Sequence, residues 1–352
     1  MYNMKDLGYY KTDKILSKNC DYNIIYGGRG NGKSYAVKSF LIKDFYENGR
    51  QFAYIRRWDR DITKNLVTAY MADAPVSSLT NETFDIVTAD RGIISLGKLN
   101  GEKITSKSPA GFYFSVNQAS RYASTAYPKL RNLLFEEFIP IDGRYAPDEL
   151  ELWTHLISTL TRNYPDIKIF MVCNSISRQS PYWDEYGVQD LVMRQDLGDL
   201  NVVERKTKGG VQKIAIEYTK PLKVTSKLFA GKRETMTVEG KWLADPQPKL
   251  PAGKWQNVAE FYVERLNMIY KCTYKIQGEN YCIYVERAEK IPKSKRVISD
   301  KFSTSPYYTR RFDPINDYER QLFNMLPDKC CYSDDLTGTE FNETIEYFLT
   351  DT

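Results

Sequence analysis

The chain has 352 residues, of which 42% are hydrophobic, and this is enough for one large or two ordinary domains with buried cores. The first residues lack the apolar stretch of a signal peptide, and no segment approaches the roughly 18 apolar residues that span a bilayer, so we expect an unexported protein with no membrane partner. Six cysteines without CxxC spacing and a single histidine, His155, argue against a Cys/His zinc site and favour reduced, cytoplasmic thiols.

The charge is mild overall, at +5, but it is unevenly distributed. Residues 201–310 hold 22 Lys and Arg against 11 Asp and Glu, a net charge of +11, whereas residues 311–352 hold 3 against 10, a net charge of −7. The basic segment indicates a polyanion contact in the second half of the chain. The alternative is a solvated, lysine-rich surface.

Short apolar runs alternate with helix-like stretches over the first 200 residues, which predicts a mostly parallel sheet flanked by helices. The expected strands are 23–26, 52–55, 133–135 and 167–172. Helices are expected over 34–45 and over the amphipathic segment that carries Leu152, Trp153, Leu156, Ile157 and Leu160. We therefore predict an α/β P-loop NTPase domain over residues 1–200.

The composition changes after residue 200. A polar, lysine-rich stretch bracketed by glycines and prolines predicts a linker subdomain over 201–255, with a helix over 224–244. Alternating apolar and polar residues over 267–274 and 281–285 predict a β-hairpin. We expect this hairpin to open a smaller α+β domain over 256–352.

The strongest motif is the sequence GGRGNGKS, which satisfies G-x-x-x-x-G-K-[ST] between a predicted strand and a predicted helix. The glycines let backbone N–H groups turn inward around phosphate oxygens, and the helix N-terminus points its positive end at them. Lys33 would neutralise the β/γ charge of ATP, and Ser34 would ligate Mg²⁺. The expected nucleotide-binding residues are Gly27, Gly28, Arg29, Gly30, Asn31, Gly32, Lys33 and Ser34. The alternative is a glycine-rich turn with no ligand.

An acidic pair closes the apolar strand at 133–135, at the end of the strand where ligands bind in open α/β sheets. We predict that Glu136 is the acid on the metal side and that Glu137 polarises the attacking water. The alternative is a surface acidic pair. Glu136 is one methylene longer than the Asp that usually stands first, which could weaken or reposition the metal contact.

Two further residues are candidates for catalysis. Asn174, at the end of the strand over 167–172, would sense the γ-phosphate or would cap a turn. Arg162, directly after the amphipathic helix, would reach the nucleotide of a neighbouring subunit, or would lie against the C-terminal dipole of that helix. The competing arginines are Arg56, Arg57, Arg60, Arg121, Arg131 and Arg178.

A family resemblance follows from several runs in order, over most of residues 15–185. The runs are 27–36 (GGRGNGKSYA), 51–57 (QFAYIRR), 126–128 (AYP), 135–138 (FEEF), 162–163 (RN), Asn174 and 181–182 (PY). Together they resemble the phi-29-type phage genome-packaging ATPases, which are large-terminase-like P-loop motors of the additional-strand (ASCE) type. Over 200–352 the resemblance is faint.

The resemblance implies an ATP- and Mg²⁺-dependent motor that drives double-stranded DNA into a procapsid. It implies a homopentameric ring in the host cytoplasm that docks transiently on the portal vertex, and for some members a structural packaging RNA. It further implies that Arg29 and Arg162 contribute to catalysis, and that the C-terminal domain resembles a vestigial RNase H-like nuclease.

Nuclease activity is not expected, because the predicted hairpin contains no Asp and the first Asp after residue 245 is Asp300. The leading hypothesis is a DNA-packaging ATPase. The alternatives are a terminase large subunit with a working nuclease, a nucleic-acid-binding scaffold stabilised by nucleotide and, as a fallback, a nucleotide or small-molecule kinase.

Overall fold

The chain divides into two compact units in its computed structural model. The structure describes residues 8–140, 143–162, 164, 166–174, 180–222, 247–266, 268–310 and 312–350. The first unit holds residues 1–177 and 194–242, and the second holds residues 178–193 and 243–352. The helix predicted over 224–244 lies outside the described residues.

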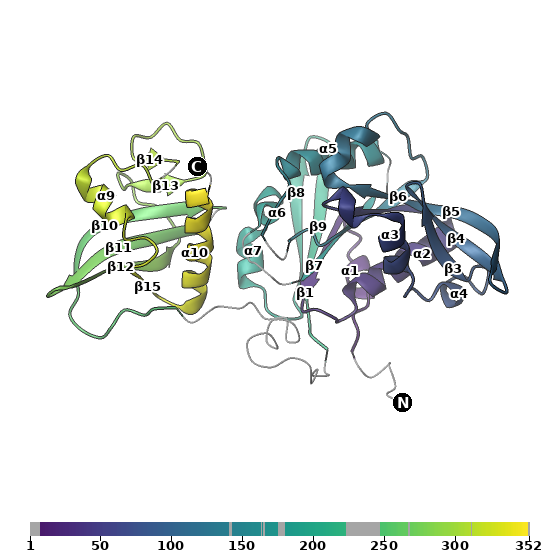
Figure 1. Ribbon diagram of the computed structural model, residues 1–352, viewed down its shortest axis with the longest axis horizontal. Coiled ribbons are helices and arrows are strands. Elements are labelled where there is room, and N and C mark those ends of the chain that lie inside the picture. Colours follow the sequence, from purple (N-terminus) through teal and green to yellow (C-terminus); the bar gives the residue numbers. More distant parts are fainter. Residues whose placement is uncertain are drawn as a thin grey trace. The chain divides into compact units, whose positions relative to one another are not determined.

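The first unit is built on a nine-stranded sheet (Figure 1). Its strands are β1 (Tyr22–Gly27), β2 (Gln51–Arg56), β3 (Ile86–Asp90), β4 (Ile93–Asn100), β5 (Lys103–Ser115), β6 (Leu130–Glu136), β7 (Lys168–Asn174), β8 (Leu200–Thr207) and β9 (Gly210–Thr219). They lie in the order β3-β4-β5-β2-β6-β7-β1-β9-β8. Six neighbouring strands run parallel to one another, namely β5, β2, β6, β7, β1 and β9. β3 and β4 at one edge and β8 at the other are antiparallel to their neighbours.

Helices cover both faces of this sheet, because alternate residues of each buried strand point to opposite sides. Phe170 of β7 meets Phe40 of α2, with ring centroids 5.4 Å apart. On the other face Phe135 of β6 meets Trp153 of α5 at 4.7 Å. The α-helices of the first unit are α1 (Asp13–Leu16), α2 (Lys33–Asn48), α3 (Lys64–Met71), α4 (Val76–Leu79) and α5 (Glu149–Thr161), and its 3₁₀ helices are η2 (Asp59–Asp61) and η3 (Val116–Tyr122).

All four predicted strands and both predicted helices of the first unit are present, but the sheet is larger than expected. The predicted strands do not include β3, β4 and β5, and one half of β5 is exposed and carries no apolar alternation. Residues 201–219, which were assigned to a linker subdomain, instead form most of β8 and all of β9. The assignment was wrong there because the polar turn at 208–210 joins two strands of a hairpin, and β9 is buried beside β1.

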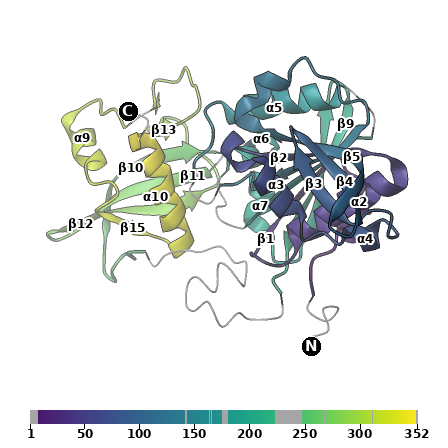
Figure 2. The ribbon, with the colours of Figure 1, turned by 45° about the vertical axis from the view of Figure 1, so that its right-hand side comes forward.

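The second unit is a six-stranded sheet with helices. Its strands are β10 (Gln256–Arg265), β11 (Met268–Gln277), β12 (Asn280–Ala288), β13 (Val297–Ser299), β14 (Tyr308–Thr309) and β15 (Cys330–Tyr332). They lie in the order β14-β13-β10-β11-β12-β15. The helices α9 (Asp317–Phe323) and α10 (Asp335–Thr350) supply Phe323, Phe341 and Ile345 to its core. Figure 2 shows α10 along this sheet.

The predicted hairpin is present as β11 and β12, but it does not open the second sheet. β10 precedes it and pairs with β11 along its length, with a register shift between Asn257 and Ala259. Between β7 and β8 the chain forms α6 (Pro181–Glu185) and α7 (Gln189–Arg194). In the described ranges no helix combines the length and apolar character needed to cross a membrane.

Candidate nucleotide-binding site

The glycine-rich loop joins β1, which ends at Gly27, to α2, which begins at Lys33. Gly30 and Gly32 have φ angles of 78° and 89°, in the left-handed region that glycine adopts without a Cβ penalty. A Cβ atom at Gly27 would clash with the side chain of Thr219 on β9. The loop therefore has the strand–loop–helix geometry in which backbone N–H groups and a helix N-terminus face a bound anion.

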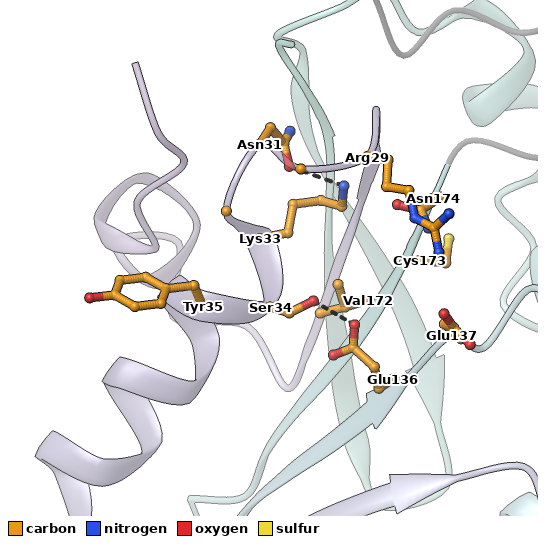
Figure 3. A pocket seen from close by; sticks show the side chains of 12 residues that line it. Arg29, Asn31, Lys33, Ser34, Tyr35, Glu136, Glu137, Val172, Cys173 and Asn174 are labelled. Carbon is orange, nitrogen blue, oxygen red and sulfur yellow. Dashed lines mark hydrogen bonds between the residues drawn. The ribbon is translucent and has the colours of Figure 1, made fainter. Parts of the chain in front are cut away.

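A cavity of about 280 Å³ lies against this loop. Figure 3 shows the side chains that surround it. Its lining residues are Arg29, Gly30, Asn31, Gly32, Lys33, Ser34, Tyr35, Glu136, Glu137, Val172, Cys173 and Asn174. The structure thus brings together six of the eight predicted loop residues, both predicted acids and Asn174, from positions far apart in the sequence. Gly27 and Gly28 are not among the lining residues.

Lys33 is buried and turns back onto the loop that carries it. Its Nζ donates to the carbonyl oxygens of Gly27 (3.2 Å) and Gly28 (2.6 Å) and to Asn31 Oδ1 (3.1 Å). Burial lowers the pKa of Lys33 to about 8, although the nearby Cys173 and Glu136 act in the opposite direction. The ammonium group is thus held by uncharged carbonyl and amide oxygens. Negatively charged phosphate oxygens would bind it more strongly and can take their place.

Glu136 ends β6 on the face of the sheet that α2 covers, and it is buried. Ser34 Oγ donates to its Oε1 at 2.5 Å, and the hydroxyl of Tyr70 on α3 donates to its Oε2 at 2.7 Å. Burial raises the pKa of Glu136, and the hydrogen bonds from Ser34 and Tyr70 act against that rise. Glu136 and Ser34 therefore present neighbouring oxygens at the cavity.

Glu137 leaves the strand in a left-handed conformation, with a φ angle of 55°. Its backbone N–H donates to the carbonyl oxygen of Val172 at 2.7 Å, which ties it to β7. Its carboxylate is paired with Arg56 at the end of β2, with 2.6 Å between Nη2 and Oε2. Glu137 is therefore held at the cavity by Arg56, which the sequence indicates only as one of several arginines that compete with Arg162.

Asn174 is the last residue of β7 and lies in register with Gly27 of β1. This register brings its amide to the same sheet edge as the loop, where it lines the cavity. Whether Asn174 senses the γ-phosphate or caps a turn stays a prediction; the structure places it at the cavity.

Arg162 is not among the residues that line the cavity. It caps the C-terminus of α5 with a φ angle of 40°, is exposed, and donates from Nη2 to the carbonyl oxygen of Thr125 at 3.0 Å. Among the other arginines that are candidates for reaching a neighbouring subunit, Arg57 is buried and paired with Glu149 at 2.7 Å. Its guanidinium group is therefore engaged within its own chain. Arg178 lies outside the described residues.

The structure adds contacts that no local pattern reveals. Asn31 Nδ2 donates to Thr219 Oγ1 at 2.7 Å and to the carbonyl oxygen of Lys220 at 3.1 Å, and Thr219 Oγ1 donates to the carbonyl oxygen of Tyr26 at 3.0 Å. The loop is thereby fastened to the end of β9. Periodicity could not have found Thr219, because its role depends on the pairing of β9 with β1.

The oxygens of Ser34 and Glu136 are of the type that Mg²⁺ prefers, and they lie beside a cavity suited to phosphates. Within the part of the chain that the structure describes, no group of three or more His, Cys, Asp and Glu side chains could hold a metal by itself. A magnesium ion that takes one or two protein oxygens and several phosphate oxygens needs no such group. The residues present therefore fit a nucleotide-bound Mg²⁺.

The fold and this loop together define an α/β protein of the P-loop class. A profile of the Podovirus DNA encapsidation protein (Gp16) family matches residues 4–212, which is more than half of the chain. The protein belongs to this family, and the resemblance to the phi-29-type packaging proteins is confirmed.

Two relatives illustrate the match. The DNA packaging protein of Bacillus phage phi29 is 32% identical over 177 residues, which are 50% of this chain and 49% of that protein. The DNA packaging protein of Bacillus phage B103 is 30% identical over 218 residues, which are 58% of this chain and 63% of the relative. The matched region thus spans about half to two thirds of the length of these relatives.

The fold extends further than the sequence match. A chain of the bacteriophage Phi-29 viral genome packaging motor assembly superposes with a TM-score of 0.59 over 97% of this chain and 99% of that chain, at 18% identity. A chain of the Phi-28 gp11 DNA packaging motor gives a TM-score of 0.52 at 14% identity, and 98% of each chain is covered. At this identity the likeness shows a shared fold.

Proposed function

We propose that this protein is the ATPase of a phage DNA-packaging motor, which couples ATP hydrolysis to the movement of double-stranded DNA into a procapsid. Membership of the DNA encapsidation family and the names of the relatives support a role in DNA packaging. The observation that carries the enzymatic part is the gathering of Lys33, Ser34, Glu136 and Glu137 around one cavity.

Each of these residues has a role in the proposed reaction. Lys33 and the N-terminus of α2 bind the β- and γ-phosphates, and Ser34 and Glu136 hold Mg²⁺, which supplies charge neutralisation at the phosphates. Glu137 accepts a hydrogen bond from the attacking water and polarises it. Asn174 contacts the γ-phosphate. Arg29, on the exposed part of the loop, adds positive charge at the same cavity.

The strand order supports an additional-strand (ASCE) P-loop ATPase. β7 lies between β1, which carries the loop, and β6, which carries the acidic pair. The inserted strand separates Glu137 from the loop by the width of one strand, and this leaves space for a water molecule beside the terminal phosphate.

We infer that the second unit is an RNase H-like domain without nuclease activity. Its three antiparallel strands β10, β11 and β12 are flanked on the β10 side by the parallel strands β13 and β14, which is the arrangement of that fold. Glu264 of β10 lies in register with Ser299, just before Asp300. Lys301 Nζ is 2.9 Å from Glu264 Oε1, where a catalytic metal would require free carboxylate oxygens.

The partners follow from the same proposal. We infer a homopentameric ring that docks on the portal of a procapsid in the host cytoplasm, with a structural packaging RNA as a further partner. Arg162 would reach the nucleotide of the adjacent subunit, and its exposure supports this role. DNA contacts should be made to phosphates, because a motor has to move over any sequence.

The test is ATP hydrolysis by the purified protein with and without double-stranded DNA and procapsids. We expect Mg²⁺-dependent hydrolysis that the other motor components stimulate, and its loss in Glu137→Gln with nucleotide binding retained. Hydrolysis that no component stimulates would point to a different ATPase. Nucleotide binding without any hydrolysis in the complete system would instead support a nucleotide-stabilised scaffold.

A further inference from the structure

The carboxylate of Glu136 is held by two hydroxyl groups, one on each oxygen. Ser34 Oγ donates to Oε1 at 2.5 Å, and Tyr70 OH donates to Oε2 at 2.7 Å. Tyr70 lies on α3, 66 positions away in the sequence. We propose that Tyr70 is a positioning residue for the magnesium site, and that its phenol fixes the plane of the Glu136 carboxylate. This inference rests on the proposed function, in which Glu136 holds the metal.

Tyr70 can play this part because its own ring is fixed from two sides. The ring of Tyr54 on β2 stacks on it, with centroids 4.4 Å apart and planes at 21°. Lys38 Nζ of α2 lies 4.1 Å from the ring centroid. The hydroxyl is therefore presented to Glu136 in one direction.

The backbone of Tyr70 is held as well. Lys38 Nζ donates to the carbonyl oxygen of Tyr70 at 2.5 Å, and the same ammonium group pairs with Asp73 just after α3. Lys38 is buried and lies on the helix that begins at the phosphate-binding loop. The arrangement fastens α3 to α2, the helix that also carries Ser34.

A glutamate in this position needs a second donor more than an aspartate would. Glu has one more rotatable bond, and its terminal torsion has a broad, shallow energy minimum. A single hydrogen bond from Ser34 fixes one oxygen and leaves the carboxylate free to rotate about that terminal bond. The bond from Tyr70 to the other oxygen removes this freedom, so that Oε1 stays beside Ser34. Donors of this kind behind a metal ligand typically change metal affinity or activity by about 10- to 100-fold.

The test is Tyr70→Phe, which keeps the ring and its stacking and removes only the hydroxyl. In the full-length protein we expect binding of a fluorescent ATP analogue in EDTA to be unchanged. The increase in affinity that Mg²⁺ gives to the wild type should be reduced, and the Mg²⁺ concentration for half-maximal binding should rise by about 10- to 100-fold. Electron paramagnetic resonance of Mn²⁺ with a non-hydrolysable ATP analogue gives a second readout that does not depend on turnover.

Two controls separate positioning from a general effect on folding. Tyr46→Phe removes a hydroxyl from the same unit, where Tyr46 lies 3.1 Å from Thr83 Oγ1 on the surface, and it should leave metal-dependent binding unchanged. In a Glu136→Gln background, Tyr70→Phe should produce no further loss of metal affinity, because the carboxylate on which it acts is gone.

The outcomes distinguish this inference from the proposed function. Equal metal dependence in Tyr70→Phe and the wild type, with a clear Mg²⁺ effect in both, would overturn the role of Tyr70 alone. If Mg²⁺ changes neither nucleotide binding nor hydrolysis in the wild type, the metal role of Glu136 is overturned, and this inference with it.

Discussion

Arg56 Nη2 and Glu137 Oε2 lie 2.6 Å apart, and this ion pair joins the ends of β2 and β6 at the edge of the nucleotide cavity. Both side chains are partly exposed, with 20% and 32% of their surfaces accessible, so the pair can respond to a ligand. The ion pair orients the carboxylate of Glu137, which we propose polarises the attacking water.

Arg56→Ala should lower the kcat for ATP hydrolysis by about 10- to 100-fold, because small misplacements of a catalytic group have effects of this size. Nucleotide affinity should be nearly unchanged, since Arg56 does not line the cavity. The measurement is steady-state hydrolysis with DNA and procapsids, alongside a binding titration. Arg60→Ala, at an exposed arginine, is the matched control. A kcat equal to that of the wild type would show that Glu137 is oriented without Arg56.

Binding of ATP near pH 8 should be accompanied by proton uptake at Lys33. Burial lowers its pKa to about 8 in the nucleotide-free protein, so a fraction of the molecules carries a neutral amine at that pH. The phosphates favour the charged form and raise the pKa, and the protein then takes up protons. Calorimetry in two buffers with different ionisation enthalpies measures this uptake.

The uptake should vanish well below pH 8, where Lys33 is already charged, and it should be absent in Lys33→Met. The lowered pKa of Lys33 also affects the stability of the nucleotide-free protein. Between about pH 8 and 10.5 the unfolded chain binds more protons at this lysine, so its contribution to the stability of the nucleotide-free protein rises with pH. Binding heats that do not depend on the buffer at pH 8 would contradict the neutral fraction of Lys33.

Arg162→Ala and Glu137→Gln should each abolish hydrolysis in homogeneous rings, but mixtures should regain part of it. In a mixed ring, a subunit with an intact Glu137 can receive Arg162 from a neighbour that carries the other substitution. The measurement is the rate as a function of mixing ratio at constant total protein. If no ratio gives more than the sum of the two inactive proteins, Arg162 does not act in trans.

Arg57→Met should destabilise the first unit without acting through the nucleotide. Arg57 is buried, pairs with Glu149 at 2.7 Å, and donates to the carbonyl oxygens of Glu137 (3.0 Å) and Phe138 (2.6 Å). Removing one partner of a buried ion pair costs about 3–5 kcal/mol. Urea unfolding should show this loss, whereas Arg60→Met at the surface should change the free energy of unfolding by less than about 0.5 kcal/mol. Equal stability of the two variants would rule out a structural role for Arg57.

The full-length protein should not nick supercoiled plasmid in the presence of Mn²⁺. Lys301 neutralises Glu264, and the neighbouring Asp300 is partly buried with its pKa raised by burial. Agarose gels with a metal-dependent nuclease run in parallel provide the measurement. Nicking that is lost in Glu264→Gln would restore the hypothesis of a terminase with a working nuclease.

The sequence by itself determined the loop, the strand that precedes it and the helix that follows it. These features depend on local chemistry, because glycine permits the left-handed turns at Gly30 and Gly32, and the apolar period sets the helix face. The acidic pair was also found from the sequence, since the carboxyl ends of parallel strands meet at one edge. The roles assigned to the individual site residues remain predictions.

Only the tertiary structure decided which side chains support these groups. Tyr70 and Arg56 reach Glu136 and Glu137 across separations of 66 and 81 residues, through packing of α3 on the sheet and the order of β2 and β6. The polar turn before β9 is a local signal that predicts a linker, whereas the place of β9 beside β1 is a long-range pairing. Such pairings depend on register and on burial against distant strands, neither of which a local window contains.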